Sequence, residues 1–306
     1  MIRALLPTSF TFLGFAASVF GVVFINPDTT NTTAPTGQYA NSGWDYQGQW
    51  GSFLGTAIAP NAFVTAKHIN FLYSVGDTFT YQGTNYTTTA KFEDASSDLT
   101  IWQVSGTFPN YAPLYTAGQE LGKELVVFGR GREKGNAVTV NAELKGWEFG
   151  AWQNTQRWGT NTVSGYADGG LYLTADFNQT GGANEAHLSE GDSGGAVFIQ
   201  EAGIWKLAAI NYAIDGPYST SATGAGSFNA TLFDRGGLYQ SDGVGWQLIT
   251  ESILDKPSAF YSTRISERID WVQSTIPEPA RISFGYAIAI GLAVILGSLF
   301  RRGYRR

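Results

Sequence analysis

The sequence predicts an all-β protein whose core ends in a single helix. Short apolar runs that alternate with polar residues recur along the chain, for example at 53–59, 62–68 and 99–104. Turn-forming residues separate these runs, and the 306 residues include 38 glycines. The chain has no visible internal repeat. This pattern is typical of a β-barrel or a β-sandwich.

The N-terminal segment, residues 1–26, has the layout of a secretory signal peptide. Arg3 precedes an apolar run that reaches Ile25, so we expect the chain to be exported. The cleavage position is open, because small residues do not form an A-x-A pattern, and an uncleaved signal anchor is the alternative. Residues 27–49 are the expected linker and first strand region, with a polar stretch at 28–37.

Residues 50–276 form the expected folded core. Its further strands are expected at 77–92, 124–130, 137–147, 170–177, 195–199 and 204–214. The core closes with residues 262–276, where apolar residues at i, i+4, i+7 and i+11 predict an amphipathic helix. This apolar stripe consists of Ile265, Ile269, Val272 and Ile276.

The C-terminal segment, residues 277–306, predicts a membrane-spanning end. Residues 282–300 carry no charge and are just long enough to cross a bilayer as a helix. The arginines that follow should stay on the cytoplasmic side; they are Arg301, Arg302, Arg305 and Arg306. An ordinary tail anchor fits these features.

The same segment also resembles a known sorting signal. Pro277-Glu278-Pro279, one short span and an arginine-rich end are similar to the PEP-CTERM signal of Gram-negative bacteria. This resemblance implies that the inner membrane holds the chain only transiently, through residues 282–300. An exosortase-type processing enzyme would then remove the tail and deliver the protein to the cell surface or the extracellular matrix.

Composition narrows the possible functions. Residues 27–276 hold 13 Lys and Arg against 24 Asp and Glu, a net charge of −11. Such an acidic core argues against binding to nucleic acid, which requires a basic surface. Cysteine is absent, so disulfides, thiolate metal sites and thiol nucleophiles are excluded.

Three short blocks carry the candidate catalytic residues. His68 ends one apolar run, Asp98 precedes another, and Ser193 lies in Gly-Asp-Ser-Gly-Gly. A Gly-Asp-Ser-Gly stretch alone is often only a polar turn. A base beside a serine hydroxyl makes the serine a nucleophile, and a carboxylate beside that base orients it. The three blocks together therefore indicate more than a turn.

These blocks resemble the chymotrypsin-like (trypsin-like) serine proteases. The similar segments are "TAKHI", "SDLTIWQV", "GDSGGAVF" and the closing "YSTRISERIDWVQSTI", which occur in the family's order over about residues 50–276. The resemblance implies a double six-stranded β-barrel closed by a C-terminal helix. It implies an exported serine endopeptidase that acts on proteins or peptides and needs no metal or cofactor.

The resemblance also assigns roles to individual residues. Ser193 would be the nucleophile of an acyl-enzyme mechanism, His68 its general base, and Asp98 the group that orients the imidazole. The backbone N–H groups of Gly191 and Ser193 would form the oxyanion hole.

The residues that would set specificity depart from the family pattern. The floor of the S1 pocket would be His187, six positions before the nucleophile, and its wall Asn211, Tyr212 and Ala213. A histidine there predicts neutral polar, aromatic or acidic P1 residues rather than basic ones. His187 could instead be a surface or wall residue without a role in specificity. A shift of one residue would place Ala186 or Leu188 at the floor and make the pocket apolar.

Two further departures leave questions open. No Ile/Val-Gly-Gly terminus precedes residue 37, so either Asp192 finds another partner or the loop forms without zymogen cleavage. Residues 214–256 exceed the family's usual connection and are either functional or plain surface. The competing functions are a catalytically silent, protease-like binding protein of the surface or matrix, and a structural matrix protein.

Overall fold

The computed structural model describes residues 21–25, 30–152 and 154–276. Residues 1–20 of the expected signal peptide and the whole expected sorting segment lie outside this range. In the described part of the chain, no helix is both long and apolar enough to cross a membrane.

The first half of the core is a closed six-stranded β-barrel, as expected. Its strands follow the order β2-β3-β4-β7-β6-β5. Phe63 and Phe79 stack inside it with ring centroids 3.9 Å apart, because Gly48 and Gly55 leave room where any side chain would meet these rings. The strands are β2 (Gln47–Trp50), β3 (Phe53–Ala59), β4 (Ala62–Ala66), β5 (Thr78–Tyr81), β6 (Thr84–Glu93) and β7 (Leu99–Val104).

The second half differs from the expected six-stranded barrel. It is a seven-stranded sheet in the order β11-β8-β15-β16-β21-β13-β12, whose ends do not pair with each other. Asn161 of β11 reaches the strand next to the far end: its Nδ2 donates to the carbonyl oxygen of Asp176 (2.9 Å), and also to that of Ala186 (3.0 Å). The strands are β8 (Glu124–Gly129), β11 (Arg157–Thr162), β12 (Gly165–Ala167), β13 (Tyr172–Asp176), β15 (Ala196–Glu201), β16 (Ile204–Ile214) and β21 (Ala259–Arg264).

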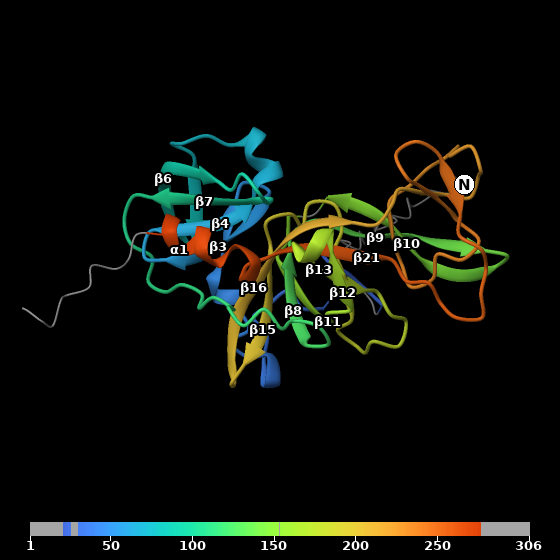
Figure 1. The fold of residues 1–306 in the computed structure, drawn as a ribbon, viewed down its shortest axis with the longest axis horizontal. Helices are drawn as coiled ribbons and strands as arrows, with labels where there is room; N and C mark the ends of the chain where they lie inside the picture. Colours follow the sequence, from blue (N-terminus) through green and yellow to red (C-terminus); the bar gives the residue numbers. More distant parts are fainter. Residues whose placement is uncertain (1–20, 26–29, 153, 277–306) are drawn as a thin grey trace, which may run out of the picture.

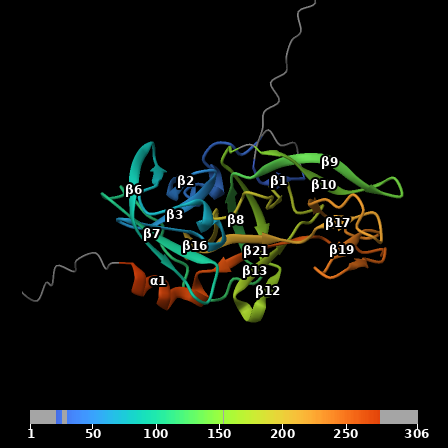
Figure 2. The same cartoon turned by 90° about the horizontal axis from the view of Figure 1, so that it is seen from above.

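The long 214–256 stretch forms an ordered lobe. Figures 1 and 2 both place it, with the hairpin of β9 (Arg132–Val140) and β10 (Glu143–Trp152), at the end of the molecule opposite the first barrel. Its own strands are β17 (Tyr218–Ser219), β18 (Ala230–Leu232), β19 (Tyr239–Ser241) and β20 (Trp246–Leu248), with β18 paired to β10. The apolar core of the lobe contains Val138, Tyr218, Ala230, Leu232 and Leu238.

The closing helix is shorter than expected. The helix α1 spans Ile269–Thr275 and follows a 3₁₀ turn, η5, at Ser266–Arg268. Residues 262–264 belong to β21 instead, because they pair with β13 and β16. Arg268 anchors the turn to the first barrel through Asp94, which follows β6 (2.5 and 2.8 Å). Figure 1 accordingly shows α1 beside β3, β4 and β7.

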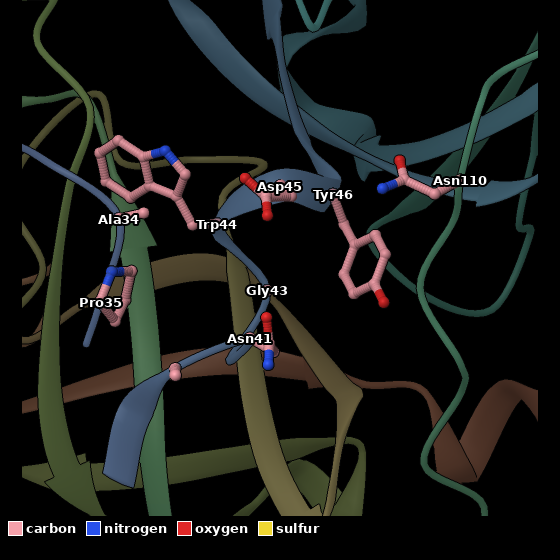
Figure 3. A pocket seen from close by; sticks show the side chains of 9 residues that line it. Ala34, Pro35, Asn41, Gly43, Trp44, Asp45, Tyr46 and Asn110 are labelled. Carbon is pink, nitrogen blue, oxygen red and sulfur yellow. The ribbon is translucent and has the colours of Figure 1, made fainter. Parts of the chain in front are cut away.

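The segment before the first barrel is packed rather than a free linker. It contains the 3₁₀ turns η1 (Gly37–Tyr39) and η2 (Trp44–Tyr46). Trp44 meets Phe128 edge-on and Tyr46 stacks on Phe198, so this segment covers the second sheet. A cavity of about 250 Å³ opens here, lined in part by Trp44, Tyr46 and Asn110 (Figure 3). The residues His68, Asp98 and Ser193 do not line it.

The end of the predicted signal segment is a buried strand in the structure, and the cleavage position stays a prediction. The strand β1 (Val23–Phe24) pairs with β14 (Ala186–His187), and residues 22–24 are fully buried. Arg157 holds the segment: its Nη1 donates to the Val22 carbonyl oxygen (2.8 Å), and its guanidinium lies 4.1 Å from the centroid of the Phe24 ring. Residues 22–24 are therefore part of the protein core.

Candidate active site

The pairing of two strands brings His68 to Asp98. Ala66 of β4 is opposite Leu99 of β7, so the residues just beyond this pair are neighbours. His68 lies in the 3₁₀ turn η3 (Lys67–Leu72), whose first N–H donates to the Asp98 carbonyl oxygen (2.9 Å). Asp98 then accepts twice from His68: Oδ1 from the backbone N–H (2.8 Å) and Oδ2 from Nδ1 (2.7 Å). Both the position and the ring orientation of His68 are fixed.

The second half of the molecule supplies Ser193. Its Oγ lies 2.8 Å from Nε2 of His68, which completes a chain of hydrogen bonds from Asp98 to the hydroxyl. The Asp98 side chain is only 9% exposed, whereas that of His68 is 37% exposed. The carboxylate is thus shielded from water, and the imidazole and hydroxyl face the outside.

Glycine is required where the serine loop meets the first barrel. Gly194 has φ +76°, and a side chain there would collide with the Thr65 hydroxyl and the Leu54 carbonyl oxygen. The same hydroxyl donates to the Leu54 oxygen (2.9 Å), so neither group can easily move aside. The approach of Ser193 to His68 therefore depends on Gly194.

Two backbone donors next to the serine are unused. Within the described ranges, the N–H groups of Gly191 and Ser193 have no acceptor, whereas Asp192 N–H donates to Ser189 (3.2 Å) and Gly195 N–H to Asp192 (3.1 Å). A free N–H group on the serine itself and a second one two residues before it are the kind of donors that an oxyanion hole needs. Gly191 has φ +92°, a conformation that glycine tolerates best.

Asp192 has partners other than a conventional activation terminus. Its carboxylate accepts from Gly131 N–H (2.7 Å) and from both the N–H (2.7 Å) and the hydroxyl (3.0 Å) of Ser189. The Val22 backbone is near enough to lower the pKa of this carboxyl slightly. Burial nevertheless raises the pKa of Asp192 to about 6, because these neutral donors only partly offset the loss of water.

Asn211 holds the serine loop rather than facing a ligand. It is fully buried, and its Nδ2 donates to the carbonyl oxygens of Phe128 (2.8 Å) and Asp192 (3.1 Å). Its backbone oxygen accepts from Gly194 N–H (3.2 Å), and its own N–H donates to Gly195 (2.8 Å). These four bonds fix the turn that carries the nucleophile.

A cavity of about 210 Å³ lies beside Ser193. The three residues predicted for the S1 wall, Asn211, Tyr212 and Ala213, line it. The Asn211 side chain is nevertheless buried, as described above. The lining residues are Leu188, Ser189, Glu190, Gly191, Asp192, Ser193, Asn211, Tyr212, Ala213 and Ile214. Tyr212 also meets the His68 ring edge-on at 5.9 Å and stacks on Tyr172 at 4.6 Å.

The structure does not place His187 at the floor of the cavity beside Ser193. His187 is fully buried in β14, and the next residue, Leu188, is among the residues that line the cavity. Its Nδ1 donates to the Leu188 carbonyl oxygen (2.6 Å), and the rings of Phe177 and Phe260 pack against it. Burial lowers the pKa of His187 to about 4, so the imidazole is neutral near pH 7. Which residue forms the pocket floor stays a prediction.

No sequence motif indicated the aromatic and charged residues that surround this loop. Trp152, at the end of β10, packs on Gly191, and Arg132 pairs with Glu190 (2.8 Å). Trp152 and Arg132 belong to the β9–β10 hairpin. The position of this hairpin against the serine loop depends on tertiary packing, which no local sequence pattern shows. In the described part of the chain, no three His, Asp or Glu side chains are grouped so that they could hold a metal ion.

Comparisons with known proteins give limited information. No family model and no curated protein matches the chain. Among solved structures it is similar to neuropsin, a serine protease expressed in the limbic system of mouse brain. The two are 14% identical, the match covers 77% of this chain and 96% of neuropsin, and the TM-score is 0.47. The function proposed below therefore rests on the geometry of the site and not on this similarity.

Proposed function

We propose that the protein is a serine endopeptidase that hydrolyses peptide bonds through an acyl-enzyme on Ser193. One observation supports this most strongly: the continuous hydrogen-bond chain from Asp98 through His68 to the Ser193 hydroxyl, with links of 2.7 and 2.8 Å. A structural turn needs no such chain. A catalytically silent relative would have no reason to keep an exposed imidazole aligned with a serine.

The geometry supports each step of the reaction. His68 Nε2 takes the proton of the Ser193 hydroxyl as Oγ attacks the substrate carbonyl carbon. The resulting oxyanion accepts from the N–H groups of Gly191 and Ser193. His68 then gives its proton to the leaving amine. In the second half of the reaction His68 takes a proton from water as the water attacks the acyl-enzyme, and it returns that proton to Ser193 Oγ. Asp98 keeps Nδ1 protonated and stabilises the imidazolium.

Substitutions in the triad test this mechanism. His68→Ala, Asp98→Asn and Ser193→Ala should each lower kcat by about 10⁴-fold or more, with an unchanged circular dichroism spectrum. The measurement is hydrolysis of a fluorogenic peptide library by the purified enzyme. A Ser193→Ala protein that still hydrolyses peptides at the wild-type rate would exclude the mechanism.

The cavity beside Ser193 favours an apolar P1 residue. Leu188, Ala213 and Ile214 offer aliphatic surface, and Tyr212 adds an aromatic edge. Of its two carboxylates, Glu190 is paired with Arg132 and Asp192 is saturated by backbone donors. A charged P1 side chain would therefore be buried without a partner, which is costly. Peptide p-nitroanilides that differ only at P1 should show kcat/KM about 100-fold higher for Leu or Phe than for Lys or Glu. Equal rates would refute this specificity.

The buried segment 22–24 supports a specific signal cleavage site. Removal of a signal peptide after Gly21 would leave the α-amine of Val22 near Asp192, because the Val22 backbone already lowers the pKa of this carboxyl slightly. The amine would then neutralise this buried carboxylate, so export and formation of the serine loop would be coupled. N-terminal sequencing of the exported protein should begin at Val22. A mature chain that begins at residue 27 or later would contradict this site.

We also propose the sorting pathway that the C-terminal sequence indicates. The exported chain would be held in the inner membrane through residues 282–300, processed by an exosortase-type enzyme, and released to the surface or matrix of a Gram-negative bacterium. Deletion of residues 277–306 should release an active core into the periplasm or medium, because the deletion leaves every described element up to α1 intact. Unchanged surface retention of the truncated protein would argue against a sorting tail.

A further inference from the structure

The last residue of the β9–β10 hairpin lies directly on the oxyanion loop. The six-membered ring of Trp152 lies against Gly191, and a Cβ added at Gly191 would lie only 2.0 and 2.6 Å from two of its atoms. The same Cβ would lie 3.0 Å from the Cα of Gly131. Gly191 therefore has no room for a side chain beside the Trp152 ring and the Gly131 backbone.

The indole is itself held in place. The Arg132 guanidinium lies 5.0 Å from the centroid of the Trp152 ring. Its Nη1 donates to the Gly150 carbonyl oxygen (2.9 Å) and its Nε to Glu190 Oε2 (2.8 Å). Arg132 also donates its backbone N–H to the Glu190 carbonyl oxygen (3.0 Å).

The residue before Gly191 is anchored on both of its carboxylate oxygens. Arg132 binds one oxygen of Glu190, and Asn229 Nδ2 from the 214–256 lobe donates to the other. Asn229 is fixed in turn, because its carbonyl oxygen accepts from Phe149 N–H on β10 (3.1 Å). Both insertions, the hairpin and the lobe, thus converge on the peptide that precedes Gly191.

We propose that Trp152, Arg132 and Glu190, here called the hairpin clasp, are positioning residues that fix the Gly191 N–H in the oxyanion hole. Glycine has the greatest backbone freedom of all residues, so its N–H would otherwise lose orientation. An oxyanion hole is effective because its donors need no reorganisation during the reaction. This inference rests on the proposed function. It assigns a role in catalysis to the two insertions, the β9–β10 hairpin and the 214–256 lobe.

The clasp acts on the transition state more than on the bound substrate. Loss of a single oxyanion donor typically costs about 10²–10³ in kcat, so loss of its support should cost part of that. Trp152→Ala should lower kcat by about 10- to 100-fold and change KM by less than about threefold. Trp152→Phe, which restores an aromatic face, should recover most of the rate.

A matched control exists in the neighbouring 214–256 lobe. Trp246 of β20 covers Gly224, another glycine with positive φ (+74°), but it does not touch the serine loop. Trp246→Ala removes the same kind of contact and should leave kcat unchanged. Glu190→Gln keeps the size of the side chain and weakens the anchor, so its kcat should lie between those of wild type and Trp152→Ala. This second variant remains informative if Trp152→Ala does not fold.

The deciding experiment compares a tetrahedral inhibitor with a ground-state ligand. The affinities of a peptide boronic acid, whose adduct places an oxygen in the oxyanion hole, and of the matching peptide carboxamide are measured with each variant. In Trp152→Ala the boronate should bind at least tenfold more weakly and the carboxamide equally well. Equal loss for both ligands, or no loss for the boronate, would overturn the positioning role. A wild-type protein that binds no boronate and cleaves no peptide would overturn the proposed function itself.

Discussion

Gly194 is the residue at which the two halves of the molecule must touch for the triad to exist. It lies against Thr65 and Leu54 with φ +76°. The motif around Ser193 is informative because close backbone approach and positive φ restrict several of its positions to glycine. The sequence therefore predicted which residues lie together, and the structure does bring them together. Their catalytic roles stay a prediction.

Substitution of this glycine should inactivate the protein selectively. Gly194→Ala places a Cβ 2.5 Å from the Leu54 carbonyl oxygen, so the serine loop must shift. A displacement of about 1 Å at a nucleophile costs about 100-fold in rate, which we expect for kcat/KM. Gly203→Ala is the matched control: φ is +79°, yet the added Cβ meets nothing within 4 Å. It should leave kcat/KM unchanged, and similar losses in both variants would contradict the packing argument.

His187 shows the limit of inference from a single residue. Counting back from the serine assumes that side chains keep the same direction, but Ala186 and His187 are both fully buried, and Leu188, the next residue, is the one that lines the cavity. Val23 of β1 pairs with His187, and β1 lies in the segment that the sequence assigns to a signal peptide. No local pattern indicated this pairing.

A pH-dependent stability difference should reveal the buried histidine. Its folded pKa of about 4 lies below the usual histidine pKa of 6.5, so His187 contributes stability above pH 6.5 that is lost as the pH falls toward 4. At full extent this amounts to about 3 kcal/mol. Asp192, with a raised pKa, contributes stability at low pH that is lost as the pH rises from about 4 to about 6.

Comparison with His187→Gln separates these opposite effects, because both proteins retain Asp192. Urea unfolding should show the wild type losing about 3 kcal/mol relative to the variant between pH 6.5 and 4. The preference for P1 residues should not differ between the two proteins. A pH-independent difference in the free energy of unfolding, or a changed P1 preference, would refute the buried position of His187.

At the scale of elements, buried apolar strands were predictable, and segments of two or three residues were not. The first-barrel strands β3, β4 and β7 coincide with apolar runs, since almost all of their residues are buried. The predicted helix at 262–276 lost its first residues to β21, because ladder pairing with β13 and β16 outweighs helical periodicity. The strand β1 was hidden because an apolar N-terminus satisfies a signal peptide and a buried strand equally well.

The contribution of β1 to the fold can be measured directly. Phe24 is fully buried, and Phe24→Ala should lower the free energy of unfolding by about 3–5 kcal/mol. Phe71 is 83% exposed, and Phe71→Ala should change it by less than about 0.5 kcal/mol. Equal effects of the two substitutions, measured by urea unfolding, would show that β1 is not part of the core.

At the scale of the whole molecule, the candidate active site lies where a closed barrel meets an open sheet. The barrel supplies His68 and Asp98, and the sheet supplies Ser193, so the site exists only when both halves are folded and docked. The η5 turn connects them through Arg268 and Asp94. The two insertions extend from the sheet and reach back to the serine loop. The contacts of these insertions with the serine loop could not be predicted from the sequence, because contacts between loop residues about 40 positions apart leave no periodic signal.

Covalent labelling tests the central claim most directly. The purified core is treated with a fluorophosphonate, digested, and the modified peptide is located by mass spectrometry, with Ser193→Ala and His68→Ala proteins treated in parallel. We predict one adduct per wild-type chain, on Ser193, and none on either variant. An unlabelled wild-type protein, or a label on another residue that persists in Ser193→Ala, would contradict an activated Ser193 nucleophile.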